Sequence, residues 1–141
     1  MGRILAIDYG TRRTGIAVTD PGQIIASPLE TVPTHELMHY LEDYFHKEDV
    51  ELLVVGKPLQ ADGSPSESMK PLQFFMQAFR KRFPDQKVEW MDERYTSSMA
   101  SAAMLEGGVK KKGRQDKGMV DKISASLILQ SWMERRNNLF A

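Results

Sequence analysis

The spacing of apolar residues predicts a series of short strands. Residues 3–9 and 14–19 are runs rich in Ile, Val and Ala joined by a polar connection, the pattern of a β-hairpin. Residues 23–32 follow a Pro-Gly turn and predict a third antiparallel strand. Residues 51–56 form a continuous apolar run, as expected of a strand buried on both faces of a sheet. A further short strand is predicted at 87–91.

Helical spacing predicts the elements between and after these strands. Thr34 is a suitable N-cap for a helix that carries Leu37 and Leu41 on one face. Amphipathic helices are also expected near 74–83, over 96–106 and from about 119 to 136. The aromatic residues expected in the core of the second helix are Phe74, Phe75 and Phe79. Three antiparallel strands followed by alternating helices and parallel strands predict an α/β fold, with a mixed five-stranded sheet and helices on both faces.

Composition limits the possible classes of function. The chain of 141 residues is long enough for one domain, expected to span residues 1–141. Nineteen basic and nineteen acidic side chains leave no net charge, so any surface for nucleic acid must be local. The absence of cysteine excludes disulfides, zinc–thiolate sites and cysteine nucleophiles. No signal peptide or membrane span is evident, so we expect a cytoplasmic protein without a membrane partner.

Asp8 interrupts the first strand near its end, where an apolar side chain would be expected. A buried carboxylate costs several kcal/mol unless it is paired or binds a metal ion. One interpretation is that Asp8 accepts hydrogen bonds from the backbone of residues 10–13. Gly10 and Gly15 are expected to let this hairpin turn tightly.

Other acidic residues favour a metal site instead. Asp92 and Glu93 follow the strand at 87–91, so they would reach the same carboxyl edge of the sheet as Asp8. Asp121 lies near the start of the last helix, beside its apolar stripe. Converging carboxylates repel one another unless a cation lies between them, and a hard divalent ion fits this role. Two such ions could activate water for phosphodiester hydrolysis.

Four segments resemble the motifs of a known family. In order and spacing, "AIDYGTRRTGIAVTD", "VVGKPLQADGS", "DERYTS" and "DKISASLILQ" are similar to those of the YqgF (RuvX) family of Holliday-junction-resolvase-like proteins, to which processing of pre-16S rRNA is ascribed. The match spans nearly the whole chain. The resemblance implies a ribonuclease H-like fold and a nuclease of the two-metal type, dependent on Mg²⁺ or Mn²⁺.

The resemblance also implies the site residues and the substrate. Asp8, Glu93 and Asp121 correspond to the catalytic, metal-binding set, with Asp92 as the alternative to Glu93. The strand ending at Gly56 is followed by Lys57-Pro58 and carries no acid at its tip, unlike better-known resolvases. The implied substrate is the 5′ end of pre-16S rRNA, in ribosome biogenesis, or branched DNA. A non-catalytic RNA- or ribosome-associated module of the same fold is the remaining alternative.

Basic residues beside these acids could bind nucleic acid. Arg12 and Arg13 lie in the turn after Asp8, and Arg94 follows the proposed second acid, where each could hold phosphate or neutralise a carboxylate. A basic run close to Asp121 could follow a nucleic-acid backbone or simply solubilise a loop. Its residues are Lys110, Lys111, Lys112, Arg114 and Lys117. Both a monomer and a homodimer are compatible with the sequence, and a two-fold dimer would suit a four-way junction.

Two other functions receive less support. His35 to His39 matches the HExxH pattern of zinc proteases, but helical spacing turns His35, His39 and His46 away from the apolar face, so they are expected in solvent. The strand, aspartate and glycine hairpin also occur in ATPases related to sugar kinases, actin and Hsp70. Those proteins pair two such domains around the nucleotide, and this chain has the length of one.

Overall fold

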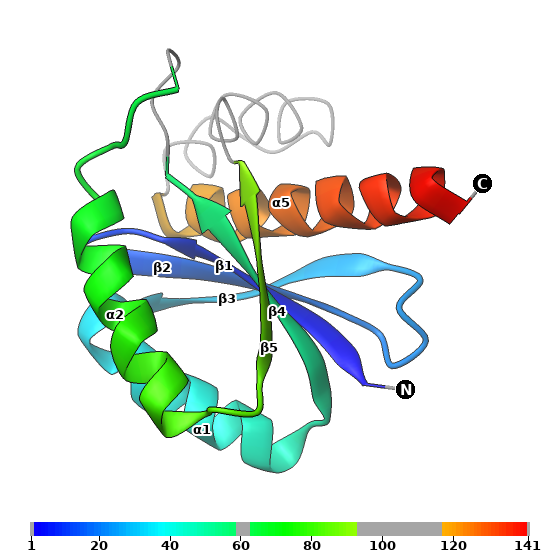
Figure 1. The fold of residues 1–141 in the computed structure, drawn as a ribbon, viewed down its shortest axis with the longest axis horizontal. Coiled ribbons are helices and arrows are strands. Elements are labelled where there is room, and N and C mark those ends of the chain that lie inside the picture. The colour runs from blue at the N-terminus through cyan, green and yellow to red at the C-terminus, as the bar shows by residue number, and fades with distance from the viewer. Residues whose placement is uncertain (1, 59–62, 93–116, 141) are drawn as a thin grey trace.

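The computed structural model describes residues 2–58, 63–92 and 117–140. Within these ranges the chain forms a five-stranded sheet in the order β3-β2-β1-β4-β5 (Figure 1). The strands are β1 (Arg3–Tyr9), β2 (Arg13–Thr19), β3 (Ala26–Pro33), β4 (Val50–Lys57) and β5 (Lys87–Asp92). The helices are η1 (Thr34–Glu36), α1 (Leu37–Lys47), α2 (Met69–Arg82) and α5 (Lys117–Phe140). The predicted helix at 96–106 lies outside the described residues.

The sheet is mixed, as the sequence predicts. β1 pairs antiparallel with β2, and β2 antiparallel with β3, whereas β1 pairs parallel with β4 and β4 parallel with β5. β1 is therefore the central strand, and its neighbours on the two sides run in opposite directions. This arrangement confirms the expectation that Asp8 lies near the end of the strand at the centre of the sheet.

Helices cover both faces of the sheet (Figure 1). On one face, Leu5 and Ile7 of β1 join a core cluster with residues of α1 and α2, among them the fully buried Phe79. On the other face, Ile4 and Ala6 pack against α5. Because side chains alternate along a strand, this division assigns every residue of β1 to one face or the other. Among the described residues, no helix is long and apolar enough to span a membrane.

Two local predictions were wrong. Thr34 does not cap a helix with its side chain: η1 begins at this residue, and its N-cap position is Pro33, without a side-chain hydrogen bond. Phe74 is 61% exposed, although it was expected in the core. The buried residues of α2 are Met69, Leu72, Met76 and Phe79, and Phe74 follows Leu72 by two positions, about 200° around the helix.

Candidate active site

Asp8 lies on the face of the sheet that α5 covers. It is half-buried, and it shares its side of β1 with Ile4 and Ala6, which pack against α5. Its partner in the neighbouring strand β2 is Gly15. Ala17, two residues further along β2, also packs on the α5 side, so Gly15 faces the same helix as Asp8.

Gly15 allows the start of α5 to approach the sheet closely. A Cβ atom on Gly15 would lie 2.0 Å from the backbone oxygen of Asp121 and 2.7 Å from the nitrogen of Lys122. Only glycine can accept this approach without displacing the helix. Gly15 was expected to serve the hairpin turn, but it lies inside β2 and accommodates the helix. This contact places the backbone of Asp121 beside Gly15, which pairs with Asp8 in the sheet.

Arg13, the first residue of β2, binds the side chain of Asp121. Its Nε donates a hydrogen bond of 2.9 Å to Oδ2 of Asp121. The side chain of Arg13 is 41% exposed and that of Asp121 is 24% exposed, so water screens the pair only in part. Arg13 thus neutralises Asp121, one of the two roles that the sequence left open for the arginines of this turn.

The turn between β1 and β2 is tight and anchored. A Cβ atom on Gly10 would lie 2.4 Å from the backbone oxygen of Arg13, which confirms the tight turn expected at this glycine. The hydroxyl of Thr34 donates to the backbone oxygen of Gly10 at 2.6 Å, and the backbone N–H of Thr34 donates to the oxygen of Arg12 at 2.9 Å. Thr34 therefore fixes the turn beside Asp8, a role that its position in the sequence did not reveal.

The strand register assigns a face of the sheet to Asp92, one of the two candidates for the second acid. Met91 of β5 packs against the cluster on the α5 face. Asp92 comes next in the strand and pairs with Lys57 of β4, so it belongs to the opposite face from Asp8. Glu93, the residue preferred from the family resemblance, lies outside the described residues.

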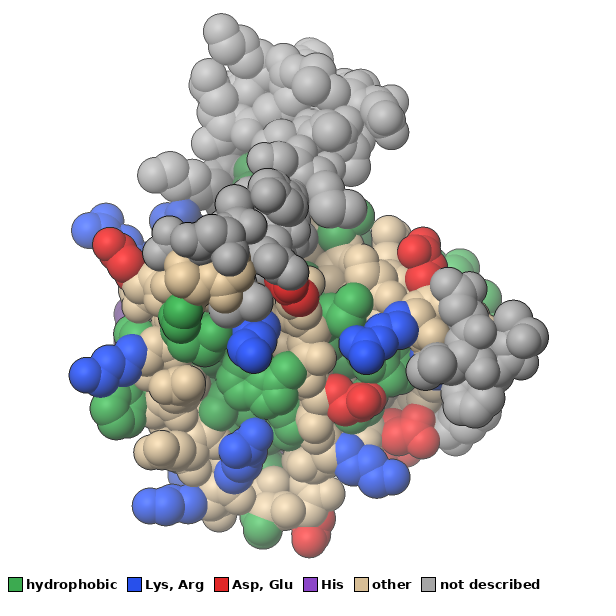
Figure 2. Space-filling model, turned by 45° about the horizontal axis from the view of Figure 1, so that its top comes forward, with side chains coloured by type: hydrophobic (Ala, Val, Ile, Leu, Met, Phe, Trp, Pro, Cys, Tyr) green, Lys and Arg blue, Asp and Glu red, His purple; other side chains and the backbone are tan. Residues whose placement is uncertain are grey.

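The structure describes only some of the predicted basic residues. Arg12 is exposed in the turn, next to the Arg13–Asp121 pair. The face drawn in Figure 2 carries Lys and Arg side chains among Asp, Glu and apolar side chains, without a continuous basic area among the described residues. Arg94 and the basic run fall outside the described residues, except that the backbone of Lys117 starts α5. The run consists of Lys110, Lys111, Lys112, Arg114 and Lys117.

The histidines of α1 and η1 are exposed, as the sequence predicts. His35, His39 and His46 all lie in solvent, and His39 makes an exposed ion pair with Asp43 at 3.4 Å. Across residues 2–58, 63–92 and 117–140, no three acidic or histidine side chains form a group that could hold a metal ion. The HExxH pattern therefore does not correspond to a zinc site in this part of the chain.

Ser124 adds an unusual group to the buried side of α5. It follows Asp121 by three residues, about one helical turn, and it is 1% exposed. Its hydroxyl has no hydrogen-bond partner among the described residues. Buried hydroxyl groups are normally paired, so this oxygen is available to a bound water or another donor. The sequence motif contains this serine but does not reveal its burial.

The chain is similar to several proteins that all carry the same name. The model of the RuvX family, described as Holliday junction resolvase, matches residues 2–135. A "Putative pre-16S rRNA nuclease" of Christiangramia forsetii is 54% identical over 133 residues, which are 94% of this chain and 98% of that protein. A protein of the same name from Bacteroides fragilis is 52% identical over 136 residues, covering 96% of this chain and 99% of the relative.

A solved structure supports the fold. The crystal structure of the fowlpox virus Holliday junction resolvase matches with a TM-score of 0.50 and 16% identity, over 94% of this chain and 99% of that one. At this identity the likeness concerns the fold alone, and it agrees with the ribonuclease H-like arrangement of the mixed sheet. Taken with the family match over most of its length, this shows that the chain belongs to the RuvX family.

Proposed function

We propose that this protein is a hydrolytic endonuclease that cleaves phosphodiester bonds in structured nucleic acid and matures the 5′ end of pre-16S rRNA. The observation that carries the proposal is the convergence of Asp8 and Asp121, from opposite ends of the sequence, where α5 rests on Gly15. The family match and the names of the relatives support the reaction class. We expect the protein to act in the cytoplasm.

The residues present fit a divalent cation. Asp8 and Asp121 offer carboxylate oxygens, which Mg²⁺ and Mn²⁺ prefer, and Glu93 is proposed as the third ligand. The close contact at Gly15 holds the backbone of Asp121 against the residue that pairs with Asp8 in the sheet. When bound, such an ion supplies Lewis acidity toward the scissile phosphate.

The chain itself supplies charge and position. Without a cation, the guanidinium of Arg13 neutralises Asp121. When a bound cation neutralises Asp121 instead, the guanidinium of Arg13 is available to donate paired hydrogen bonds to phosphate oxygens. The guanidinium of the exposed neighbour Arg12 is available for the same contact. The turn carrying both arginines is held by Thr34, so their backbone needs no ordering when the substrate binds.

The remaining basic residues are proposed to contact the nucleic-acid backbone. Such contacts orient a substrate without reading its sequence and weaken as the salt concentration rises. The residues are Arg94, Lys110, Lys111, Lys112, Arg114 and Lys117.

The test is cleavage of an RNA that carries the 5′ end of pre-16S rRNA, with Mg²⁺ or Mn²⁺. We expect the native protein to cut at defined sites and the Asp8→Asn variant to be inactive but folded, because the substitution removes a ligand charge while keeping the shape. Asp85→Asn, an exposed change near the start of β5, is the matched control and should cut normally. Equal cutting by the Asp8→Asn variant would refute the proposed site.

A four-way DNA junction is the second substrate to test, because the family model is described as Holliday junction resolvase. Cutting of the junction but not of the RNA would identify a DNA nuclease. Binding of RNA without metal-dependent cutting of either substrate would identify a non-catalytic module. Sedimentation of the protein with and without the junction distinguishes a monomer from a homodimer.

A further inference from the structure

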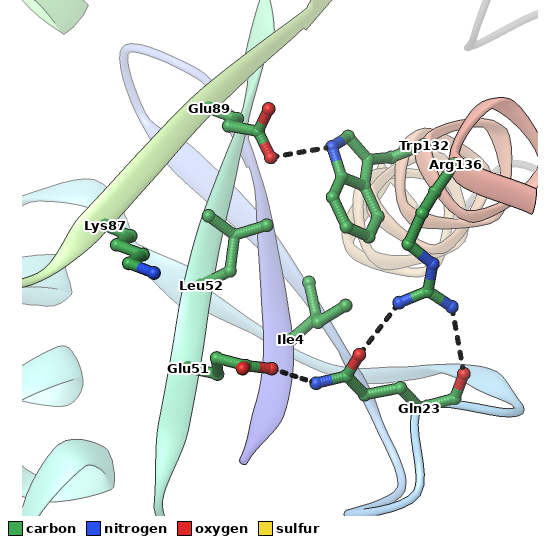
Figure 3. A pocket seen from close by; sticks show the side chains of 8 residues that line it. All are labelled: Ile4, Gln23, Glu51, Leu52, Lys87, Glu89, Trp132 and Arg136. Atoms are coloured by element: carbon green, nitrogen blue, oxygen red, sulfur yellow. Dashed lines mark hydrogen bonds between the residues drawn. The ribbon is translucent and has the colours of Figure 1, made fainter. Parts of the chain in front are cut away.

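A pocket of about 310 Å³ opens on the α5 side of the sheet (Figure 3). Ile4 and Leu52 form its apolar base, and Trp132 of α5 forms one wall. Charged side chains surround this apolar surface. Asp8, Arg13 and Asp121 do not line it, so the pocket is separate from the proposed active site.

Trp132 is held in a fixed orientation. Its indole N–H donates to Oε2 of Glu89 at 3.2 Å, and the guanidinium of Arg136 lies 5.2 Å from the ring centroid. The ring also packs against the core cluster that contains Ile4 and Leu52. These contacts fix both the ring and one oxygen of the Glu89 carboxylate before any ligand binds.

Gln23 holds the other side of the pocket. Its backbone has a φ of 58°, unusual for a residue other than glycine, and it is 9% exposed. Its side-chain amide donates to the oxygen of Gly2 at 2.8 Å and to the carboxylate of Glu51, and it accepts from Nη1 of Arg136 at 2.8 Å. Figure 3 shows this connection from β4 through Gln23 to α5. The pocket is therefore preformed, which lowers the entropic cost of binding.

The charges around the pocket favour a planar ligand with both donors and acceptors. Two carboxylates, Glu51 and Glu89, and two cations, Lys87 and Arg136, line it, so its formal charge is balanced. A free phosphate would meet both carboxylates, and a wholly apolar ligand would offer no hydrogen bonds to the four charged groups. A nucleobase presents an apolar ring together with N–H donors and ring acceptors.

The distance from the pocket to Asp8 and Asp121 suits a single nucleic-acid strand. Ile4 and Asp8 lie four residues apart on the same face of β1, about 13 Å along a strand. Asp121 and Trp132 lie eleven residues apart on α5, about 16 Å along a helix. A strand bound at Asp8 and Asp121 can span either distance with a few nucleotides.

We propose that this pocket binds a guanine base from a single-stranded segment that flanks the cleaved bond. The inference rests on the proposed function for its substrate class. Glu89 and Glu51 accept hydrogen bonds from the N1–H and exocyclic amine of guanine, while Lys87 and Arg136 donate to O6 and N7. The Trp132 ring and the aliphatic base cover the apolar surface of the ligand.

The test measures binding without divalent metal, so it does not depend on cleavage. The chain has two tryptophans, and the Trp90→Phe variant leaves Trp132 as the only tryptophan reporter. We expect the RNA pentamer UUGUU to quench this fluorescence and UUUUU, which has no exocyclic amine, to bind at least about fivefold more weakly. Anisotropy of labelled pentamers with the unaltered protein gives a second readout, in case Trp90→Phe disturbs the fold.

The variants locate the binding. Glu89→Gln should weaken UUGUU binding about fivefold or more, because it removes the charge that accepts the guanine N–H groups. Glu134→Gln, an exposed change on α5 outside the pocket, is the matched control and should bind normally. Equal binding of the two pentamers, or an unchanged affinity of the Glu89→Gln variant, would overturn the inference. If the protein binds UUGUU selectively but cuts no substrate, the pocket stands and the proposed nuclease fails.

Discussion

Nε of Arg13 lies 2.9 Å from Oδ2 of Asp121, which joins the first residue of β2 to the beginning of α5. The two residues are 108 positions apart in the sequence. In the proposed cation site, the guanidinium of Arg13 is bound to a carboxylate that would otherwise be free to bind the metal ion. Arg13 is thus a competitor of the metal as well as a candidate contact for phosphate.

Replacement of Arg13 by Gln should therefore strengthen metal binding. We expect Mn²⁺ to bind up to about fivefold more tightly, because the ion no longer competes with a guanidinium for Asp121. The free energy of unfolding without metal should fall by only about 0–1 kcal/mol, since both side chains are partly exposed. Calorimetric titration with Mn²⁺ measures the affinity. Arg12→Gln, one residue earlier and exposed, is the control; equal effects of the two changes would contradict a specific role for Arg13.

Replacement of Gly15 by Ala should displace α5. The added Cβ would lie 2.0 Å from the backbone oxygen of Asp121, so the helix must shift, at a cost of about 1–3 kcal/mol in the free energy of unfolding. The shift should also weaken Mn²⁺ binding, because Asp121 moves relative to Asp8. Urea unfolding and calorimetry measure the two effects. In Gly22→Ala the new Cβ would meet only side-chain atoms at 3.1 Å or more, and the two effects should be much smaller.

The sequence reveals the elements of this site better than their contacts. Asp8 could be proposed as a site residue because it interrupts an apolar strand, and Asp121 because it borders the apolar stripe of a helix. The role of Gly15 was missed because its neighbour in space, Asp121, is more than a hundred residues away in the sequence. A glycine inside a strand was the available signal, since it often marks a close approach of another backbone.

Strand register and contacts between distant segments explain why two other positions differ from what the sequence predicts. In the sequence Glu93 is the preferred second acid and Asp92 the alternative, and the pairing of β5 with β4 assigns Asp92 to the face opposite Asp8. Thr34 has the side chain of an N-cap, yet its hydroxyl bonds to Gly10 because β3 delivers it beside the first hairpin. Such choices depend on which segments meet in space, and local propensity contains no information on this.

Two phenylalanines of α2 provide a test of the core. Phe79 is fully buried and contacts the rings of Phe45, Phe75 and Phe83, whereas Phe74 is 61% exposed. Phe79→Ala should lower the free energy of unfolding by about 3–5 kcal/mol. Phe74→Ala should change it by less than about 0.5 kcal/mol, as is usual for surface positions. Urea unfolding of both variants compares them, and a similar loss in both would contradict the orientation of α2.

Asp20 should make the stability of the β2–β3 connection depend on pH. The backbone N–H groups of Ile25 and Ile24 each donate to Oδ1 of Asp20 at 2.8 Å, and these bonds lower the pKa of its carboxyl below the ordinary 3.8. The folded state therefore favours the ionised form. The resulting stabilisation is complete above the unfolded pKa and is lost as the pH falls through the folded pKa.

The comparison with Asp20→Asn isolates this effect, because the amide oxygen can still accept a hydrogen bond but carries no charge. We expect the native protein to be more stable than the variant near neutral pH, and the difference to shrink as the pH falls below 3.8. Urea unfolding of both proteins across this range measures the difference, while the carboxyl ¹³C shift of Asp20 reports its pKa directly. A difference in stability that stays constant into strong acid would show that the ionised carboxylate does not hold the connection.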